Sequence, residues 1–407
     1  MHILQLLLSS TSKMVSMDFF CNPMSLVFAI SALTLVFLVK ILVGKSTEKK
    51  RRYHPIGGTI FNQLFNFNRL HHYMTDLAGK HRTYRLLSPF RNEIYTADPA
   101  NVEYILKTNF ENYGKGSYNY NILRDLLGDG IFTVDDEKWG NRERMGQKLA
   151  KVVSEAARSN RTMDIQGLFM KATLDSISKV AFGVKLDSMC GSNEEGTKFG
   201  SAFDDASAMT LYRYVDIFWT IKKSLNIGSE ATLKRSIKVV DDFVYKLIHS
   251  KTELMKNSQN DSSVSESPNE ERRYFIKVSA IEGHRIDPKY LRDIILNFII
   301  AGKDTTATAL SWFIYMLCKH PTIQEKVAQE VREAINLKEA TNYAEFAASV
   351  TEEALEKMQY LHAAITETLR LYPAVPFDAK ICFSDDTLPD GFSVRKGDMV
   401  SYQPYAM

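Results

Sequence analysis

The longest hydrophobic pattern in the chain runs from residue 288 to residue 319. Its apolar residues recur every three or four positions, which is the spacing of one face of an α-helix. Asp287 is a favourable N-cap, Pro288 stands at the first helical position, and Pro321 ends the pattern. At 1.5 Å per residue this helix would be about 48 Å long, enough to cross a whole domain. The pattern consists of Leu291, Ile294, Ile295, Phe298, Ile299, Ala309, Leu310, Phe313, Met316 and Leu317.

Shorter patterns place the remaining elements. Alternating apolar and polar residues over 83–97 predict a β-hairpin, and Asp98-Pro99 is expected to cap a helix over about 99–109. Residues 381–407 return to strands around a Pro389-Asp390-Gly391 turn. Residues 257–269 are almost entirely polar and predict a surface loop. We therefore predict one mainly α domain with small β-sheets near its two ends. Further helices are expected near 164–182, 200–220, 230–256, 322–336 and 351–372.

An apolar segment at 24–44 contains Lys40 as its single charge. As a helix it would span about 31 Å, which matches the hydrocarbon core of a bilayer. The alternative, a cleaved signal peptide, is disfavoured because no small-residue cleavage site follows. Because five basic residues follow the segment, the positive-inside rule leaves the rest of the chain in the cytosol. These basic residues are Lys45, Lys49, Lys50, Arg51 and Arg52.

These features divide the chain into four parts. We expect an N-terminal extension at 1–23, a transmembrane anchor at 24–44, a basic and proline-containing hinge at 45–58, and one domain at 59–407. The hinge is expected to be stiff and non-helical because it contains His54-Pro55-Ile56-Gly57-Gly58.

Composition narrows the classes of function. The chain has 407 residues, of which 45% are hydrophobic and 24% charged, and this suits a globular domain with a large core. A net charge of +3 gives no reason to expect nucleic acid as a partner. The four cysteines lie far apart without a CxxC motif, so neither a disulfide framework nor a zinc site is expected. Without HExxH or GxSxG motifs, a hydrolase or metalloprotein is the weakest hypothesis.

The middle of the long helix carries an unusual run, Ala301-Gly302-Lys303-Asp304-Thr305-Thr306. A glycine inside a helix costs about 0.5–1 kcal/mol relative to alanine, so helix stability does not explain the run. On a helical wheel Phe298, Gly302, Thr305, Thr306 and Ala309 share one face, and Asp304 points about 100° away from Thr305. The run fits a gap beside a flat cofactor, where an acid and an alcohol can pass protons to bound oxygen. The alternative is a kinked, buried helix whose threonine bonds back to the preceding turn.

A second motif lies on the last predicted helix, where Glu367 and Arg370 are three residues apart and can form an ion pair. Such a pair alone is weak evidence, because most are solvated surface pairs. Here the pair directly precedes the helix-breaking apolar segment 371–376, about 60 residues after the long helix. The pair, the long helix and the apolar segment together form a more specific signal than the pair alone.

With these motifs the chain resembles a cytochrome P450, a haem-thiolate monooxygenase, from about Tyr53 to its last residue. The likeness rests on the basic-then-proline hinge, the AGxDTT helix, the ExxR helix, the apolar strand after it and the closing hairpin. Within the family it is most similar to the plant enzymes that hydroxylate long-chain fatty acids at the ω end. Tyr53-His54-Pro55-Ile56 and Pro389-Asp390-Gly391 are part of that likeness.

The resemblance implies roles for the residues that match the family motif in the long helix. Thr305 would hydrogen-bond the bound dioxygen and Asp304 would supply its protons, so these two would be catalytic. Ala301, Gly302 and Thr306 would lie against the haem. General acid assistance of this kind typically contributes about 10²–10⁴-fold to a rate.

The resemblance also implies roles outside that helix. Trp139 would donate to a haem propionate, and Glu367 with Arg370 would fix the helix beneath the haem. The cofactor would be haem iron, with electrons from NADPH delivered by a reductase on the same membrane. The protein would sit in the endoplasmic reticulum membrane with its catalytic domain in the cytosol, and would act on a hydrophobic small molecule. Residues expected to line the substrate cavity are Val375, Pro376 and Phe377.

The sequence departs from the family pattern in two places. The haem-ligand loop of the form Phe-x-x-Gly-x-Arg-x-Cys-x-Gly is not in the sequence, and none of Cys21, Cys190, Cys318 and Cys382 has its setting. Where the family has an arginine four residues after Trp139, this chain has a glutamate, and the segment that follows looks shortened. We therefore expect an incomplete P450 fold that binds haem poorly and is inactive as given, its full-length form being a fatty-acid hydroxylase. A non-catalytic, membrane-anchored remnant that binds a hydrophobic ligand is the alternative.

Overall fold

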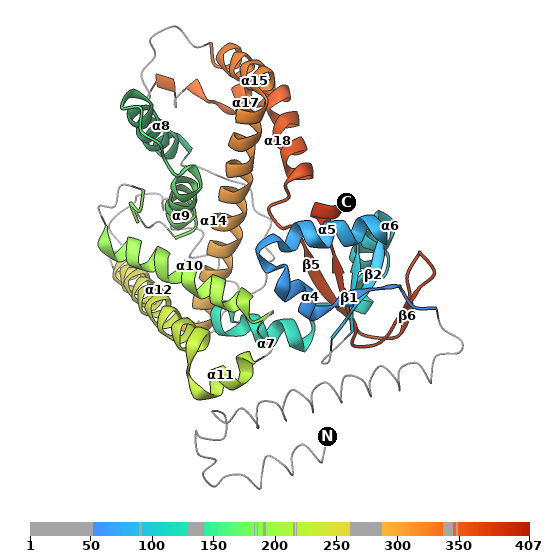
Figure 1. The fold of residues 1–407 in the computed structure, drawn as a ribbon. Coiled ribbons are helices and arrows are strands. Elements are labelled where there is room, and N and C mark those ends of the chain that lie inside the picture. Colours follow the sequence, from blue (N-terminus) through green and yellow to red (C-terminus); the bar gives the residue numbers. More distant parts are fainter. Residues whose placement is uncertain are drawn as a thin grey trace. The chain divides into compact units, whose positions relative to one another are not determined.

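The computed structural model describes two compact units of the chain (Figure 1). The described residues are 52–88, 92–128, 142–182, 184, 186–189, 193–214, 216, 218–260, 287–336, 345–346 and 349–407. The first unit comprises residues up to Gly114 together with Phe377–Met407, and the second comprises Lys115–Pro376. The predicted anchor at 24–44 and the extension at 1–23 lie outside the described residues, and among those described no helix is long and apolar enough to cross a membrane.

The first unit is built on a six-stranded sheet with the strand order β1-β2-β3-β8-β5-β4. The predicted hairpin is confirmed: β2 and β3 are antiparallel, and Tyr84 lies opposite Tyr95 with their ring centroids 5.6 Å apart. A second sheet, of β6 (Asp386–Thr387) and β7 (Ser393–Val394), encloses the predicted turn, where Gly391 has φ +82°. The strands of the larger sheet are β1 (Ile56–Thr59), β2 (Thr83–Leu87), β3 (Asn92–Thr96), β4 (Tyr113–Gly114), β5 (Asp378–Cys382) and β8 (Met399–Tyr402).

Helices α4 (Ile60–Phe65), α5 (Leu70–Lys80) and α6 (Pro99–Glu103) belong to the same unit. Asp98 caps α6 as predicted, since its side chain accepts a hydrogen bond from the Ala100 amide, and a π-helical turn at Tyr104–Thr108 continues the element. Helix α5 buries Met74, Leu77 and Ala78 in a cluster with the sheet residues Tyr84, Leu86 and Tyr95.

Residues 54–58 are non-helical, as predicted, but they are not a hinge outside the domain. Ile56–Thr59 forms β1, which pairs in parallel with β2, and the Arg85 amide bonds to the Pro55 carbonyl. His54 is buried, with its Nε2 atom 3.1 Å from Asp390 Oδ2. Tertiary contacts therefore bring residues that precede position 59 into the sheet of the first unit.

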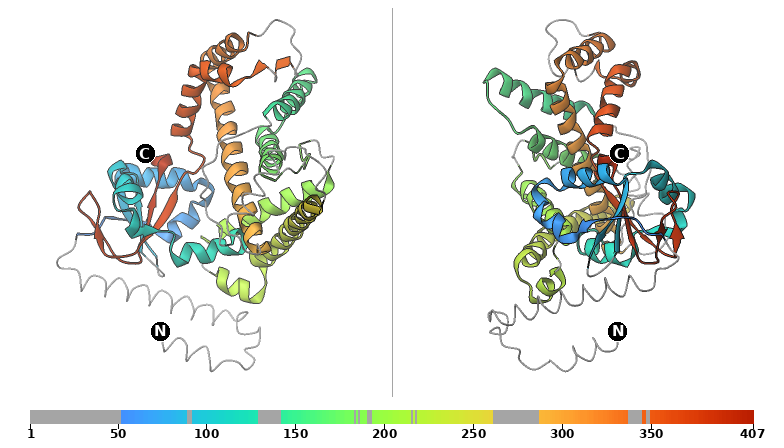
Figure 2. Two further views of the ribbon diagram at one scale, coloured as in Figure 1. Left: turned by 180° about the vertical axis from the view of Figure 1, so that it is seen from behind. Right: turned by 45° about the vertical axis from the view of Figure 1, so that its right-hand side comes forward.

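The second unit is helical (Figure 2). The long helix, α14, spans Pro288–Lys319 as predicted, and the Asp287 side chain caps it by accepting from the Lys289 amide at 2.9 Å. The pattern at 351–372 is divided at Met358 into α17 and α18, and α12 continues into the predicted polar loop as far as Asn260. The helices are α7 (Gly116–Leu127), α8 (Arg142–Arg158), α9 (Ile165–Phe182), α10 (Glu194–Tyr212), α11 (Trp219–Leu225), α12 (Gly228–Asn260), α14 (Pro288–Lys319), α15 (Pro321–Ala334), α17 (Glu352–Lys357) and α18 (Gln359–Leu371).

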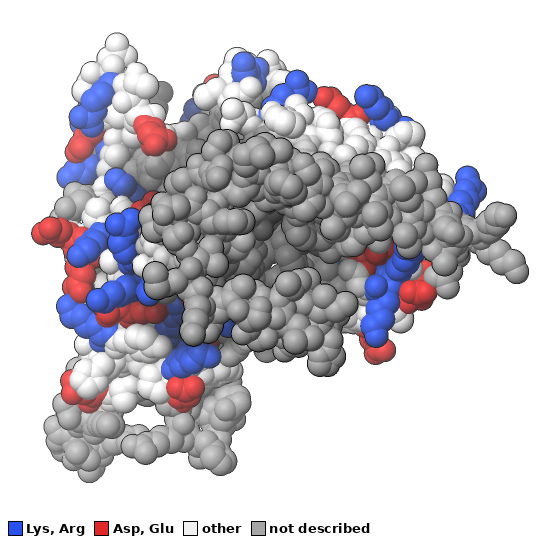
Figure 3. Space-filling view, turned by 60° about the horizontal axis from the view of Figure 1, so that its bottom comes forward, with Lys and Arg blue, Asp and Glu red and all other residues white. Residues whose placement is uncertain are grey.

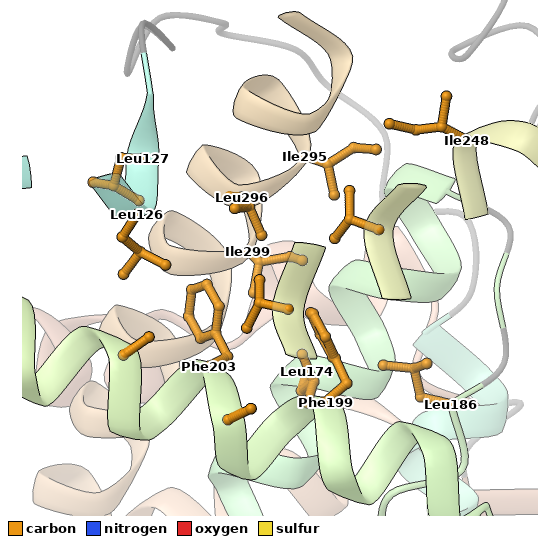
Figure 4. Packing of buried hydrophobic residues seen from close by; sticks show 14 of the residues in the cluster. Leu126, Leu127, Leu174, Leu186, Phe199, Phe203, Ile248, Ile295, Leu296 and Ile299 are labelled. Carbon is orange, nitrogen blue, oxygen red and sulfur yellow. The ribbon is translucent and has the colours of Figure 1, made fainter. Parts of the chain in front are cut away.

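The N-terminal half of α14 is the centre of the helical core (Figure 4). Ile295, Leu296 and Ile299 pack among Leu174 of α9 and Phe203 of α10. Full burial of one such side chain contributes roughly 1.5–3 kcal/mol, so this half of the helix is firmly held. On the face shown in Figure 3, basic and acidic side chains are intermixed over the described surface, in keeping with the small net charge.

Candidate functional site

The run Ala301–Thr306 lies in the middle of α14 and is helical throughout. The Thr305 hydroxyl donates a hydrogen bond to the Ala301 carbonyl at 2.5 Å, and further along Ser311 does the same to Ala307 at 2.7 Å. Such bonds to the preceding turn satisfy a hydroxyl inside a helix. The alternative expected from the sequence, a threonine that bonds to its own helix, is therefore observed. A functional role for this face of the helix depends on the groups that it contacts.

This face meets a cavity of about 330 Å³ between α14 and α18. Its volume is at the lower end of the range of small-molecule sites, about 300–1,000 Å³. Its walls are apolar apart from threonine hydroxyls, and the Thr368 hydroxyl is bonded to the Ala364 carbonyl of its own helix. The cavity can therefore accept an apolar group. The lining residues are Thr305, Thr306, Ala309, Leu310, Phe313, Ile365, Thr368, Leu369 and Ala374.

Gly302, expected beside the cofactor, does not line this cavity. A Cβ atom built on Gly302 would lie 3.0 Å from Cδ1 of Ile177 on α9, closer than ordinary van der Waals contact. The glycine therefore allows α9 to approach α14, which explains it without a ligand. Ala301 and Phe298 are also absent from the cavity wall, so one part of the predicted face, from Thr305 to Ala309, reaches the cavity.

Asp304 points away from Thr305, as the helical wheel predicts. Its carboxylate accepts a hydrogen bond at 2.9 Å from the Nζ of Lys303, which is also bonded to Asp204 of α10. Burial lowers the pKa of Lys303, but the hydrogen bonds and charges of Asp204 and Asp304 outweigh it and raise the pKa above the usual lysine value. Lys303 is therefore a charged ammonium inside the helical unit. The sequence analysis gave this lysine no role, and its signal was a cation in the middle of a largely apolar helix.

Glu367 and Arg370 form the predicted pair, with two hydrogen bonds of 2.8 and 2.6 Å. Each shifts the other's pKa: the arginine lowers the pKa of Glu367, and the glutamate raises that of Arg370. Their side chains are 57% and 65% exposed, so the pair is a surface pair with little effect on stability.

The expected substrate residues are divided by the structure. Val375 is 51% exposed and neither it nor Pro376 lines the cavity, where Ala374 stands instead. Phe377 belongs to the first unit and lies 6.2 Å from the His71 ring. The prediction missed the contribution of α18, although Ile365, Thr368 and Leu369 have the spacing of one helix face.

Comparison with known proteins identifies the family of the chain. Residues 141–407 match the model of the family Cytochrome P450. The chain belongs to the cytochrome P450 family. It is 43% identical to cytochrome P450 704C1 of Pinus taeda over 95% of this chain and 80% of that protein. It is 38% identical to cytochrome P450 704B1 of Arabidopsis thaliana (94% and 82%), and 32% identical to cytochrome P450 86B1 of the same plant (98% and 76%).

The family implies haem, and the described residues fit part of what a P450 haem needs. Thr305, Thr306, Ala309 and α18 offer a wall for a flat ring. The lining residues would not supply a thiolate ligand for the iron, because none of them is a cysteine. Cys318 is exposed, and Cys382 is buried in the first unit with its Sγ 2.8 Å from the Ser384 carbonyl. Cys21, Cys190 and Trp139 lie outside the described residues.

Proposed function

We propose that this cytochrome P450, in its full-length form, is a haem-dependent monooxygenase that inserts one oxygen atom of O₂ into a long hydrophobic substrate, by ω-hydroxylation of fatty acids. The observation that carries the proposal is the cavity between α14 and α18, because the motif residues Thr305 and Thr306 face it. The similarity to plant relatives and the apolar lining of the cavity support a lipid substrate.

Residues that line the cavity and residues on the neighbouring face of α14 would have different roles. Leu310, Phe313 and Leu369 would exclude water from the ring face. Thr305 would hold a proton at Oγ1, at the edge of the cavity. Asp304, on a different face of α14, would take protons from solvent. Haem held by a thiolate would supply the oxygen activation itself, because a thiolate ligand favours O–O cleavage.

The proposal also includes the membrane setting. The apolar segment 24–44 and the basic residues after it support a single-pass anchor in the endoplasmic reticulum with a cytosolic catalytic domain. A membrane-bound reductase would then supply electrons from NADPH. A non-catalytic protein that holds a hydrophobic ligand in the same cavity is the second candidate, supported by the apolar lining of the cavity.

The two candidates are separated by spectroscopy and product analysis. The 407-residue chain and a chimera that carries the cysteine loop of the Pinus taeda relative after Met407 are expressed with haem supplied. We expect the reduced, carbon monoxide-treated chimera to show a thiolate Soret band, the chain alone to lack it, and the chimera to oxidise fatty acids with the reductase. A thiolate band from the chain alone would refute the inactivity of this form. A chimera that binds haem and leaves fatty acids unchanged would refute the substrate.

A further inference from the structure

Lys303, the residue of the motif to which no role has yet been given, is buried between two helices. Its side chain is 2% exposed, and its Nζ bonds to Asp204 on α10 and to the adjacent Asp304. The Nζ lies 5.9 Å from the centre of the Phe203 ring and 3.8 Å from the Met170 sulfur. The Lys303 carbonyl also accepts a hydrogen bond from Thr173 on α9 at 3.0 Å. The lysine is therefore fixed in place by α9 and α10.

A buried ammonium ion requires a negative partner, because an unpaired charge inside the protein strongly destabilises the fold. Lys303 has two such partners, and both bond the same nitrogen. The Asp204 side chain is 55% exposed, whereas that of Asp304 is 34% exposed. Either carboxylate can consequently move away without leaving the Lys303 ammonium unpaired, because the other carboxylate still accepts its hydrogen bond.

The presence of two carboxylate partners on Lys303 affects how freely the Asp304 carboxylate can rotate. A carboxylate that is the sole partner of a buried lysine is held in place, because its departure exposes the full cost of the unpaired charge. A carboxylate that shares the lysine can rotate at a much smaller cost.

We propose that Asp204 and Lys303 are a positioning pair for Asp304: Asp204 retains Lys303 whenever the Asp304 carboxylate turns away, so Asp304 is free to move between its lysine partner and the side of the helix next to Thr305. Neither residue touches the cavity, so both act through Asp304. The effect on catalysis rests on the proposed function, whereas the sharing of Lys303 by two carboxylates does not.

The shared lysine is tested on the chain itself by urea unfolding. We expect D204N and D304N each to lower the urea midpoint slightly, and the double variant to lower it by clearly more than the sum of the two. Adding K303M to the double variant should restore most of the loss, because the uncompensated charge is then gone. E195Q is the matched control, since Glu195 is also on α10 and pairs with an exposed lysine, Lys246. Additive shifts, or a triple variant no more stable than the double, would overturn the proposal.

The positioning role is tested in the haem-loaded chimera with NADPH, reductase and a fatty acid. We expect D204N to raise the fraction of electrons lost as hydrogen peroxide several-fold and to increase the solvent isotope effect, with substrate affinity unchanged. D204E should restore the parent partition, and E195Q should leave it unaltered. An unaltered partition in D204N would refute the positioning role. If no variant, the parent included, oxidises fatty acids, the proposed function fails, and the unfolding series still decides the shared lysine.

Discussion

Trp312 of α14 stacks on Tyr372, the residue that follows α18, with ring centroids 4.2 Å apart and ring planes inclined by 12°. Tyr315 completes the cluster with its ring edge-on to both, at 5.5 and 6.3 Å. These aromatic residues join the end of α18 to the C-terminal half of α14. Because Phe313 and Leu369 of the same two helices line the cavity, the stack helps to hold the cavity walls in register.

Removing this stack should weaken the attachment of α18. We expect W312A and Y372A each to lower the free energy of unfolding, and the double-mutant cycle to give a coupling of about 0.5–1.5 kcal/mol, as for other aromatic pairs. Urea unfolding followed by circular dichroism measures all four proteins. Tyr360 of α18 provides the control, since it is similarly exposed and its ring faces Lys326 instead. Coupling between Trp312 and Tyr360 as large as that with Tyr372 would contradict a specific stack.

Thr305 should separate stability from activity. T305A removes a hydroxyl that bonds its own helix, and alanine is the better helix former, so unfolding should change by less than about 0.5 kcal/mol. In the haem-loaded chimera the same change should reduce product formation by roughly 10²–10⁴-fold if the hydroxyl assists proton transfer. T366A is the matched control, because Thr366 makes the same type of bond, to His362 at 2.9 Å, outside the cavity. Equal activities of the two variants would leave Thr305 without a catalytic role.

Asp390 should give the first unit an acid-dependent stability. Burial raises its pKa, but hydrogen bonds from His54 and Asn101 outweigh this and lower the pKa from 3.8 to about 2. A depressed pKa means that the stabilisation is present above pH 4 and is lost as the pH falls toward 2. The shift corresponds to about 2 kcal/mol.

D390N should therefore be less stable than the parent chain at pH 6, and the difference should shrink between pH 4 and pH 2. Unfolding followed at several pH values measures it. The control is D76N, since Asp76 pairs with Arg69 on the exposed surface. A difference between parent and D390N that is independent of pH would contradict the assignment.

The two described cysteines should differ in reactivity. Burial raises the pKa of Cys382 to about 11, so its thiol is almost entirely protonated at pH 7.5, while Cys318 is exposed. In a C21S/C190S background we expect a maleimide to modify Cys318 rapidly and Cys382 only after unfolding. Mass spectrometry of the digested protein assigns the site. Rapid modification of Cys382 in the folded chain would show that β5 is open to solvent.

Local chemistry was sufficient to predict the ends of α14 and the β2–β3 hairpin. An aspartate before a proline caps a helix, a later proline stops it, and alternating residues around a turn pair as strands, all through interactions among near neighbours in the sequence. The family could be recognised for the same reason, because its motifs are short runs with fixed spacing. Spacing also separated Asp304 from Thr305, since one helical step turns a side chain by about 100°.

Only the tertiary structure decided which partners these residues meet. Gly302 faces Ile177, Ala374 takes the place expected for Val375, and Lys303 finds Asp204 on another helix. No local rule contains this information, since each contact joins segments whose approach depends on how whole helices pack. The sequence by itself determined the helix and the residues on each of its faces; the packing of α9, α10 and α18 around it decided that one face holds a buried charge and another borders a cavity.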